Sequence, residues 1–172
     1  MPTDNQAVEI RTARAAELDA IGELTVAAYR SVPGVVVAGY EPALRDAASR
    51  AREALLLVAA DDDRLLGTVT CVLGPGRFAE SDDPLEATIR MLAVVPEARG
   101  RGVGEALVRA CLDRARSAGL ERVSLYTQPA MHAAQRLYRR LGFRRSPERD
   151  WPVPNSDLTL LAYVLDLDGR AP

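Results

Sequence analysis

Residues 99–104 read Arg-Gly-Arg-Gly-Val-Gly and join an apolar, strand-like run at 88–94 to a strongly amphipathic helix. Glycines at 100, 102 and 104 let the backbone approach a ligand closely, because no Cβ atom stands in the way. The helix that follows offers its first unpaired N–H groups and the positive end of its dipole at the same point. With the charges of Arg99 and Arg101, this segment predicts a binding site for a diphosphate or a similar anion.

The spacing of these glycines does not match two other phosphate-binding loops. A Walker loop ends in Gly-Lys-Ser or Gly-Lys-Thr, and this chain contains no lysine. A dinucleotide fingerprint requires Gly-x-Gly-x-x-Gly, whereas the order here is Gly-x-Gly-x-Gly. A basic, solvated strand-to-helix turn without a ligand is the simpler interpretation of the motif taken alone.

Length, composition and charge are those of an ordinary globular domain. The chain has 172 residues, of which 48% are hydrophobic and 27% charged, and we expect one domain over residues 1–172. A net charge of −2 argues against a nucleic-acid partner, because such proteins usually carry a strongly basic patch. No apolar run approaches the ~20 residues that span a bilayer. The N-terminus shows no secretory signal, so we expect a cytoplasmic location without a membrane partner.

The cysteines and an acidic triplet do not indicate a metal site. Cys71 and Cys111 are too few for a disulfide framework and lack the spacing of metal ligands. Both fall in apolar patterns and are predicted to be buried core residues. The triplet Asp-Asp-Asp at 61–63 lies between two strand-like runs, which predicts a hairpin turn. No bound metal is therefore expected.

Periodicity and turn residues predict a mixed sheet with helices on both faces. Strands are expected at 8–13, 54–60, 64–73, 86–95, 122–127, 143–145 and 158–167. Helices are expected at 17–30, 41–53, 102–118 and 130–141, and the polar segments 74–84 and 145–157 are expected to be loops. The order of these elements gives an α/β fold (α+β in some schemes) without internal repeats.

A second segment, 134–143, reads Ala-Gln-Arg-Leu-Tyr-Arg-Arg-Leu-Gly-Phe and lies on the helix that follows the next strand. Together with Arg-x-x-Gly-x-Gly and the order of elements, it resembles the GCN5-related N-acetyltransferases, the GNAT family. The resemblance covers nearly the whole chain and implies a mixed, mostly antiparallel sheet of six to seven strands. It also implies an enzyme that transfers the acetyl group of acetyl-CoA to a primary amine by direct attack in a ternary complex.

The resemblance implies two contact regions for acetyl-CoA. The backbone of Leu92, Ala93 and Val94 would pair with the amides of the pantetheine arm, as an added strand would. The pyrophosphate would be held by the loop itself, which consists of Arg99, Gly100, Arg101, Gly102, Val103 and Gly104. Many family members place an asparagine on the pantetheine arm where this chain has Met131, so one side-chain contact of the family is missing here.

The resemblance also implies two catalytic residues. Tyr138 occupies the position whose hydroxyl protonates the departing thiolate in the family, and a phenol with a pKa of about 10 is protonated at neutral pH. Glu86 lies in the region where several members carry a glutamate that deprotonates the acceptor amine. A solvated carboxylate at a strand end is an equally good interpretation of Glu86. His132 and a water relay stay open as the base.

The acceptor pocket of the family is built from variable loops, which correspond here to 32–40, 74–84 and 145–157. The candidate aromatic walls and the acidic groups that could attract a cationic amine are Tyr29, Tyr40, Phe78 and Trp151, and Glu80, Asp82 and Asp83. A small-molecule amine and a peptide or protein amine both stay open as the acceptor. A homodimer stays open as the assembly.

Two other functions stay open. A GNAT-fold module could bind coenzyme A as a sensor or regulator with weak or no catalysis, an idea that the presence of Tyr138 disfavours. A regulatory domain could use the glycine loop for another nucleotide. The absent Walker lysine and the missing dinucleotide spacing both disfavour that second alternative.

Overall fold

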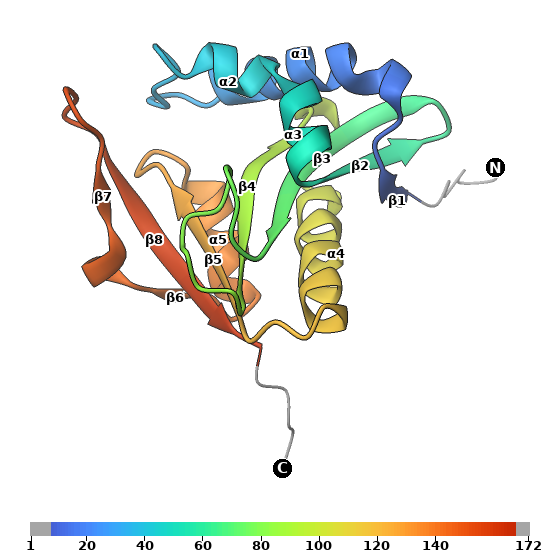
Figure 1. Cartoon of the computed structure of the whole chain (residues 1–172). Coiled ribbons are helices and arrows are strands. Elements are labelled where there is room, and N and C mark those ends of the chain that lie inside the picture. Colours follow the sequence, from blue (N-terminus) through green and yellow to red (C-terminus); the bar gives the residue numbers. More distant parts are fainter. Residues whose placement is uncertain (1–7, 168–172) are drawn as a thin grey trace.

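The fold is organised around a mixed sheet. The computed structural model describes residues 8–167, and within them the sheet has eight strands (Figure 1). The strands are β1 Glu9–Thr12, β2 Leu55–Asp61, β3 Arg64–Leu73, β4 Glu86–Val94, β5 Arg122–Thr127, β6 Arg144–Arg145, β7 Trp151–Pro152 and β8 Thr159–Asp166. Their order is β1-β2-β3-β4-β5-β8-β6, with β7 paired to β8. The expected strands are all present, and β7 is added inside the segment predicted to be a loop.

Every strand pairing is antiparallel except that of β4 with β5. This pair runs from Glu86 opposite Arg122 to Ile89 opposite Leu125. Parallel neighbours need a crossover connection, and helix α4 (Val103–Ser117) supplies it. The glycine loop at 99–104 therefore begins the crossover, just after the carboxyl end of β4.

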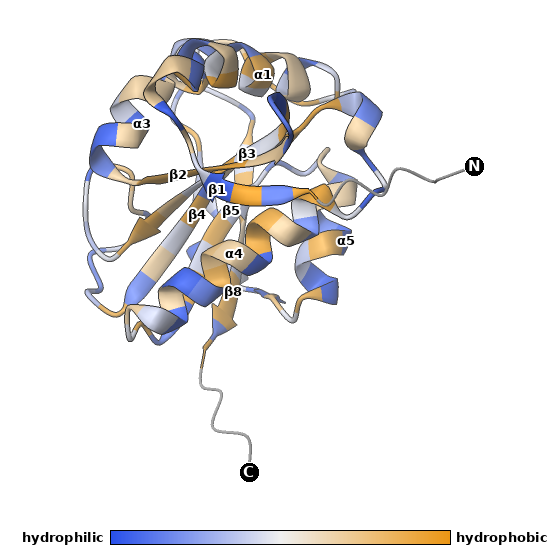
Figure 2. Cartoon of the chain, turned by 90° about the vertical axis from the view of Figure 1, so that its right-hand side faces the viewer, coloured by the Kyte–Doolittle hydropathy of each residue, from blue (hydrophilic) through white to orange (hydrophobic). Residues whose placement is uncertain are grey.

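Helices cover both faces of the sheet (Figure 2). One face carries α1 (Leu18–Arg30), α2 (Glu41–Arg45) and α3 (Ala47–Glu53), and the other carries α4 and α5 (His132–Arg140). Short 3-10 turns occupy Ala15–Glu17, Pro96–Ala98 and Pro147–Arg149. Among residues 8–167, none of the helices is long and apolar enough to span a membrane.

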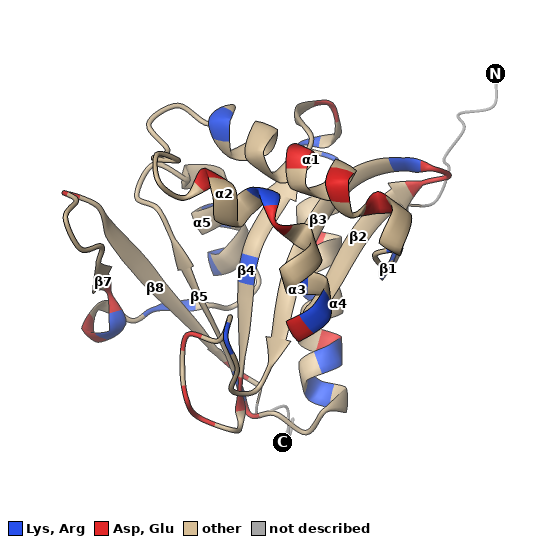
Figure 3. Ribbon diagram, turned by 45° about the horizontal axis from the view of Figure 1, so that its top comes forward, with Lys and Arg blue, Asp and Glu red and all other residues tan. Residues whose placement is uncertain are grey.

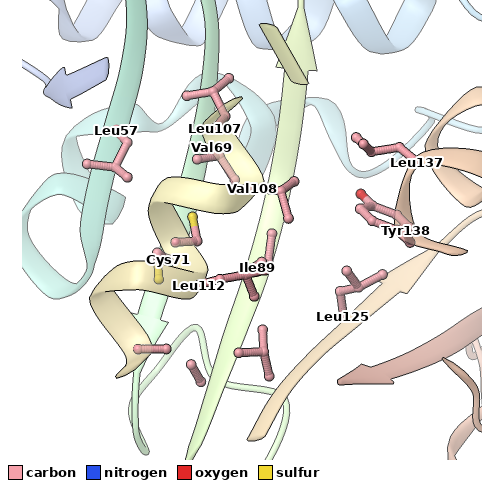
Figure 4. Close-up of a cluster of buried hydrophobic side chains, with 14 of the residues drawn as sticks. Leu57, Val69, Cys71, Ile89, Leu107, Val108, Leu112, Leu125, Leu137 and Tyr138 are labelled. Atoms are coloured by element: carbon pink, nitrogen blue, oxygen red, sulfur yellow. The ribbon is translucent and has the colours of Figure 1, made fainter. Parts of the chain in front are cut away.

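The largest hydrophobic cluster lies between α4, α5 and the sheet (Figure 4). Val108 of α4 and Ile89 of β4 both belong to it. Cys71 and Cys111 are fully buried free thiols in the same cluster, which confirms their predicted place in the core. This packing holds α4 against the strands that carry the candidate site.

Gly67 of β3 allows α4 to lie close to the sheet. A Cβ atom built at this position would lie 2.8 Å from Ala93 O and 3.1 Å from Leu107 Cδ1. Any larger residue would therefore separate α4 from β3 and β4. The close approach fixes where the N-terminus of α4 stands relative to the end of β4.

The helix expected over 41–53 is wrong as a single element, because it breaks at Asp46 into α2 and α3. Asp46 has non-helical backbone angles (φ −79°, ψ 69°) and accepts hydrogen bonds from the Ser49 N–H at 3.0 Å and the Ser49 hydroxyl at 2.6 Å. Such a cap competes with the continuing helix. Arg50 then bridges the break by donating to the carbonyl oxygens of Ala43 and Leu44 at 2.7 and 3.1 Å.

Candidate functional site

β4 carries an extra residue at Met91. Thr68 of β3 faces Ala93 and Thr70 faces Arg90, so β4 uses one residue more than β3 between these pairs. Met91 has a φ of 52°, a left-handed value that is uncommon for a residue with a Cβ atom. A β-bulge of this kind bends the strand and increases its twist.

β4 and β5 separate beyond the bulge. Their pairing ends at Ile89 opposite Leu125, although β4 continues to Val94 and β5 to Thr127. Figure 1 shows the two strands diverging toward this end of the sheet. Within the described sheet, the second half of β4 therefore has one edge without a strand partner.

The free edge of β4 presents the backbone groups of Leu92 and Val94. Val95 donates its N–H to Leu66 O at 2.9 Å, on the β3 side. Since the N–H groups of successive strand residues point to opposite edges, Ala93 also faces β3, whereas Leu92 and Val94 face the edge that β5 leaves. An extended ligand with amide groups can pair along this edge.

The glycine loop leads directly into the N-terminus of α4. Gly100 and Gly102 have φ values of 73° and 80°, and a Cβ atom built on either would meet nothing within 4 Å. Backbone conformation rather than lack of space therefore favours glycine at both positions. Gly102 is the N-cap, and Ala106 N–H makes the first helical hydrogen bond to Gly102 O at 3.0 Å. The N–H groups of residues 103–105 precede that bond and can bind an anion.

A cavity of about 920 Å³ connects the free edge of β4 to the N-terminus of α4. We call it the glycine-loop cavity. Most of the residues that the sequence assigned to the cofactor line it, namely Leu92, Ala93, Val94, Arg99, Gly100, Gly102, Val103 and Gly104. Arg101 is exposed and is not among the lining residues. The end of α1 and the first turns of α5 complete the wall.

Guanidinium groups lie along the glycine-loop cavity. Arg99 reaches the end of α1, where its Nη2 donates to Ser31 Oγ at 2.6 Å. Arg140 of α5 also lines the cavity and donates to Glu105 Oε2 at 3.1 Å. Hydrogen bonds from Arg109 and then Arg140 lower the pKa of Glu105. The negative charge of Glu105, on the first turn of α4, is thus offset by these two arginines. The positive charge of Arg99 remains and favours an anionic ligand.

Tyr138 lies in the hydrophobic core rather than in the cavity wall. It is 5% exposed, and its ring centroid lies 5.7 Å from that of Phe143 and 6.0 Å from that of Tyr163. The preceding residue, Leu137, does line the cavity, and Figure 4 shows the Tyr138 hydroxyl on the side of β4. Burial raises the pKa of this hydroxyl, so the phenol carries its proton at neutral pH.

A second cavity of about 600 Å³ adjoins the first on the other side of the bulge. We call it the hairpin cavity, because β7, β8 and the turn between them form one wall. Its floor includes Ile89, Arg90 and Met91, the β4 residues that directly precede those of the glycine-loop cavity. Tyr29 and Met131 line both cavities, so two ligands would meet at these side chains.

The hairpin cavity is lined by the loops expected to hold the acceptor. Of the predicted walls, Tyr29, Tyr40, Trp151 and Glu80 line it, whereas Phe78, Asp82 and Asp83 do not. Figure 3 shows acidic residues along the loop between β3 and β4, to which the last two belong. Most of that acidic charge therefore lies outside the cavity.

Glu80 and Arg90 form an ion pair in the wall of the hairpin cavity. Both side chains are 23% exposed, and Arg90 Nε lies 3.6 Å from Glu80 Oε1. Burial raises the pKa of the Glu80 carboxyl, with Arg90 opposing the shift. A carboxylate with a raised pKa beside a cavity is a candidate for proton transfer. The sequence indicated Glu80 as an attractor of amines but gave no sign of the role of Arg90.

Gln128 holds the loop after α1 over the hairpin cavity. Its Oε1 accepts from the Val36 N–H and its Nε2 donates to Val36 O, both at 2.8 Å. Gln128 is 6% exposed, so this amide pair is largely shielded from water. No sequence pattern pointed to Gln128, because its partner is 92 residues away.

Glu86 does not lie where the predicted base would have to act. Its side chain is 2% exposed and lines neither cavity. Arg149 Nη2 donates to Glu86 Oε1 at 2.5 Å and Nη1 to Oε2 at 3.3 Å, while Arg122 Nη1 lies 3.8 Å from Oε2. Two guanidinium groups thus enclose the carboxylate and leave it no approach for an amine. Its role is to join the start of β4 to the 147–149 turn.

His132 begins α5 and lies on the cofactor side of the site. It is exposed and lines the glycine-loop cavity but not the hairpin cavity. That position separates it from Glu80 and Arg90, which line the hairpin cavity. Within residues 8–167, no group of three His, Cys, Asp or Glu side chains could hold a metal ion.

Comparison with known proteins agrees with this geometry. The model of the Acetyltransferase (GNAT) family matches residues 18–143, which include β4, the glycine loop, α4, β5 and α5. The chain belongs to the GNAT family. The GNAT fold is confirmed by a structure of yncA from Salmonella typhimurium with its cofactor acetyl-CoA. It is 23% identical, covers 96% of this chain and 97% of that chain, and has a TM-score of 0.68.

Curated relatives match this GNAT protein over about half of its length. N-alpha-acetyltransferase 30 of Schizosaccharomyces pombe is 39% identical over 88 residues, which are 51% of this chain and 56% of the relative. Mycothiol acetyltransferase of Rhodococcus jostii is 36% identical over 91 residues, which are 53% of this chain and 29% of the relative. The chain thus spans about half of the first relative and less of the second.

Replacing Glu86 by Gln tests its structural role. Because the change leaves the Arg149 guanidinium without its counter-charge, we expect the free energy of unfolding to fall by about 2 kcal/mol. Urea denaturation followed by circular dichroism measures this change. Exposed Glu121, the residue before β5, is the matched control, and Glu121→Gln should change stability by less than about 0.5 kcal/mol. Equal stability of the two variants would contradict the structural role of Glu86.

Proposed function

We propose that this GNAT protein transfers the acetyl group of acetyl-CoA to a primary amine. The single observation that supports the proposal most strongly is the junction of two cavities at the bulge of β4. One cavity offers helix N–H groups, arginines and a free strand edge, and the other offers a carboxylate within apolar walls. A donor and an acceptor bound in them would meet beside Tyr29 and Met131.

The residues of the glycine-loop cavity fit acetyl-CoA. The N–H groups of 103–105, with Arg99 and Arg140, would hold the diphosphate. The free edge at Leu92 and Val94 would pair with the pantetheine amides, and one of these N–H groups would be available to polarise the thioester carbonyl. Bound acetyl-CoA supplies a thioester whose acetyl carbon is open to attack by an amine.

Direct transfer to the amine agrees with the cysteines of this chain. Cys71 and Cys111 are both fully buried in the core, so neither thiol can carry the acetyl group. The amine nitrogen then forms the new C–N bond as the C–S bond breaks. One proton must leave the ammonium group beforehand, and a second must leave the nitrogen once the C–N bond has formed. One proton reaches the thiolate sulfur, so the reaction releases one proton overall.

Two side chains are proposed to move these protons. Glu80 takes over the role first expected of Glu86, because it lines the hairpin cavity and burial raises the pKa of its carboxyl toward that of an effective base. Tyr138 gives a proton to the thiolate: its ring lies in the core behind Leu137, which lines the glycine-loop cavity, but its hydroxyl lies on the side of β4 (Figure 4) and burial keeps it protonated.

Replacing Tyr138 by Phe tests the proton donor. We expect kcat for thiol release to fall about 100-fold, because the departing thiolate loses its acid. The acetyl-CoA-induced rise in melting temperature should not change, since the cavity wall is intact. Tyr29→Phe is the comparison, because Tyr29 lines both cavities. A larger fall in kcat with Tyr29→Phe than with Tyr138→Phe would contradict the proposal, because Tyr29 would then be the proton donor.

Replacing Glu80 by Gln tests the base through the pH profile. A base acts only when deprotonated, so kcat/KM should fall as the pH drops through the raised pKa of Glu80. Glu80→Gln should lower kcat/KM about 100-fold and abolish this acidic limb. Asp82 is exposed on the same loop, so Asp82→Asn should leave both kcat/KM and the acidic limb of its pH profile unchanged. An acidic limb that survives in Glu80→Gln would exclude Glu80 as the base.

The sensor function makes a different prediction. A GNAT module that only binds coenzyme A would show the rise in melting temperature with acetyl-CoA but no thiol release with any amine. Thiol release across a panel of amines therefore separates the two functions.

A further inference from the structure

The hairpin cavity has one negative and one positive side chain among its described lining residues, Glu80 and Arg90. The rest of its wall is neutral. Its apolar and aromatic part includes Val36, Trp151, Val153, Pro154, Leu158 and Leu160. A ligand complementary to this wall carries two opposite charges close together and an apolar group beside them.

The Arg90 guanidinium is held in place without being saturated. Its Nη1 donates to Phe78 O at 3.1 Å, and its Cζ lies 5.8 Å from the centroid of the Phe78 ring. Its contacts with the Tyr40 hydroxyl at 3.5 Å and with Glu80 at 3.6 Å are longer. A guanidinium has five N–H donors, so donors remain for a carboxylate, which binds arginine at two points.

A second guanidinium lies behind this wall. Arg50 is 1% exposed and donates to backbone carbonyl oxygens at the break between α2 and α3. It lies within electrostatic range of both Arg90 and Tyr40. Arg50 also interacts with the Asp46 carboxylate, so the charges of Arg50 and Asp46 offset each other. Half-buried Arg90 is therefore the group in this wall that can bind an anionic part of the ligand.

We propose that the acceptor is a free α-amino acid with an apolar or aromatic side chain. Its carboxylate binds Arg90, its ammonium group lies at Glu80, and its side chain packs against Trp151 and the β7–β8 turn. This inference rests on the proposed acetyl transfer and adds the class of acceptor to it. The products are an N-acetyl amino acid and coenzyme A, whose sulfur receives the proton from Tyr138.

Other amines match the hairpin cavity less well. A polyamine carries several positive charges, whereas the described wall offers one carboxylate and one guanidinium. A peptide N-terminus has a neutral amide in place of the carboxylate, so it leaves Arg90 without an anionic partner. The adjacent charges of Glu80 and Arg90 match an ammonium and a carboxylate that are separated by one carbon atom.

Thiol release with three matched amines tests the class of acceptor. L-Phenylalanine, L-phenylalaninamide and phenethylamine share the ring and the amine but differ at the carboxylate, and L-leucine with its amide extends the series. We expect kcat/KM for each free amino acid to exceed that of its analogue without the carboxylate about 10- to 100-fold.

The outcomes separate this inference from the proposed function. Faster reaction of the amides, or of a phenylalanyl dipeptide, would overturn the carboxylate assignment and leave acetyl transfer intact. No thiol release with any amine, while acetyl-CoA still raises the melting temperature, would overturn acetyl transfer itself.

Replacing Arg90 by Gln gives a second readout that a merely structural role would not produce. We expect KM for L-phenylalanine to rise about 10- to 100-fold and KM for its amide to change little. Arg77→Gln is the matched control, because Arg77 stacks on the Phe78 ring at 5.1 Å, pairs with Glu53 and does not line the cavity. The acetyl-CoA-induced rise in melting temperature reports whether each variant folds. Equal losses with the acid and the amide would contradict carboxylate binding by Arg90.

Discussion

The bulge at Met91 divides β4 into a half that pairs with β5 and a half that does not. One additional residue relative to β3, with a left-handed φ of 52°, bends the strand at the centre of the sheet. The cost of such a backbone conformation is of order 1 kcal/mol or more, so the surrounding packing must hold it. Met91 is 5% exposed and packs with Val26 and Leu44, which provides that support. A free strand edge inside the sheet is the result, and both cavities border on it.

The two cavities also share the loop after α1 and two lining side chains. The loop after α1 is tied at Ser31 to Arg99 of the glycine loop and at Val36 to Gln128 just beyond β5. One loop is thus braced from the cofactor side and from the acceptor side. Tyr29 and Met131 stand where the cavities meet. Ligands in the two cavities would therefore contact the same side chains, as a reaction without a covalent enzyme intermediate requires.

Local patterns made half of this site predictable. The glycine loop is a local pattern, because the spacing of its glycines, the strand before it and the helix after it can all be seen in neighbouring residues. Residues 99–104 therefore predicted an anion-binding loop, and the structure places a cavity beside it. The fold followed for the same reason, because hydrophobic periodicity and turn residues are local properties. Asp46 escaped that analysis, since its capping bond to Ser49 interrupts a helix whose apolar pattern continues.

The other half of the site depends on contacts between distant segments. The family resemblance made Glu86 a candidate base, with a solvated strand-end carboxylate as an equally good interpretation. Neither interpretation could anticipate its partner Arg149, which lies 63 residues away. No sequence pattern pointed to a role for Arg90, because its place in a cavity wall depends on the bulge in β4 and on the distant β7–β8 turn. The bulge is a one-residue shift in the register between β3 and β4. The residues of β4 alone do not predict such a shift, because it depends on how the two strands pair.

Hydrogen exchange of the β4 backbone amides, measured by NMR with and without acetyl-CoA, tests the free strand edge most directly. The N–H groups of Leu92 and Val94 should exchange more slowly when acetyl-CoA is added, whereas that of Ala93, which faces β3, should change little. If acetyl-CoA bound while the exchange of Leu92 and Val94 stayed the same, the edge opened by the bulge would not be the cofactor site.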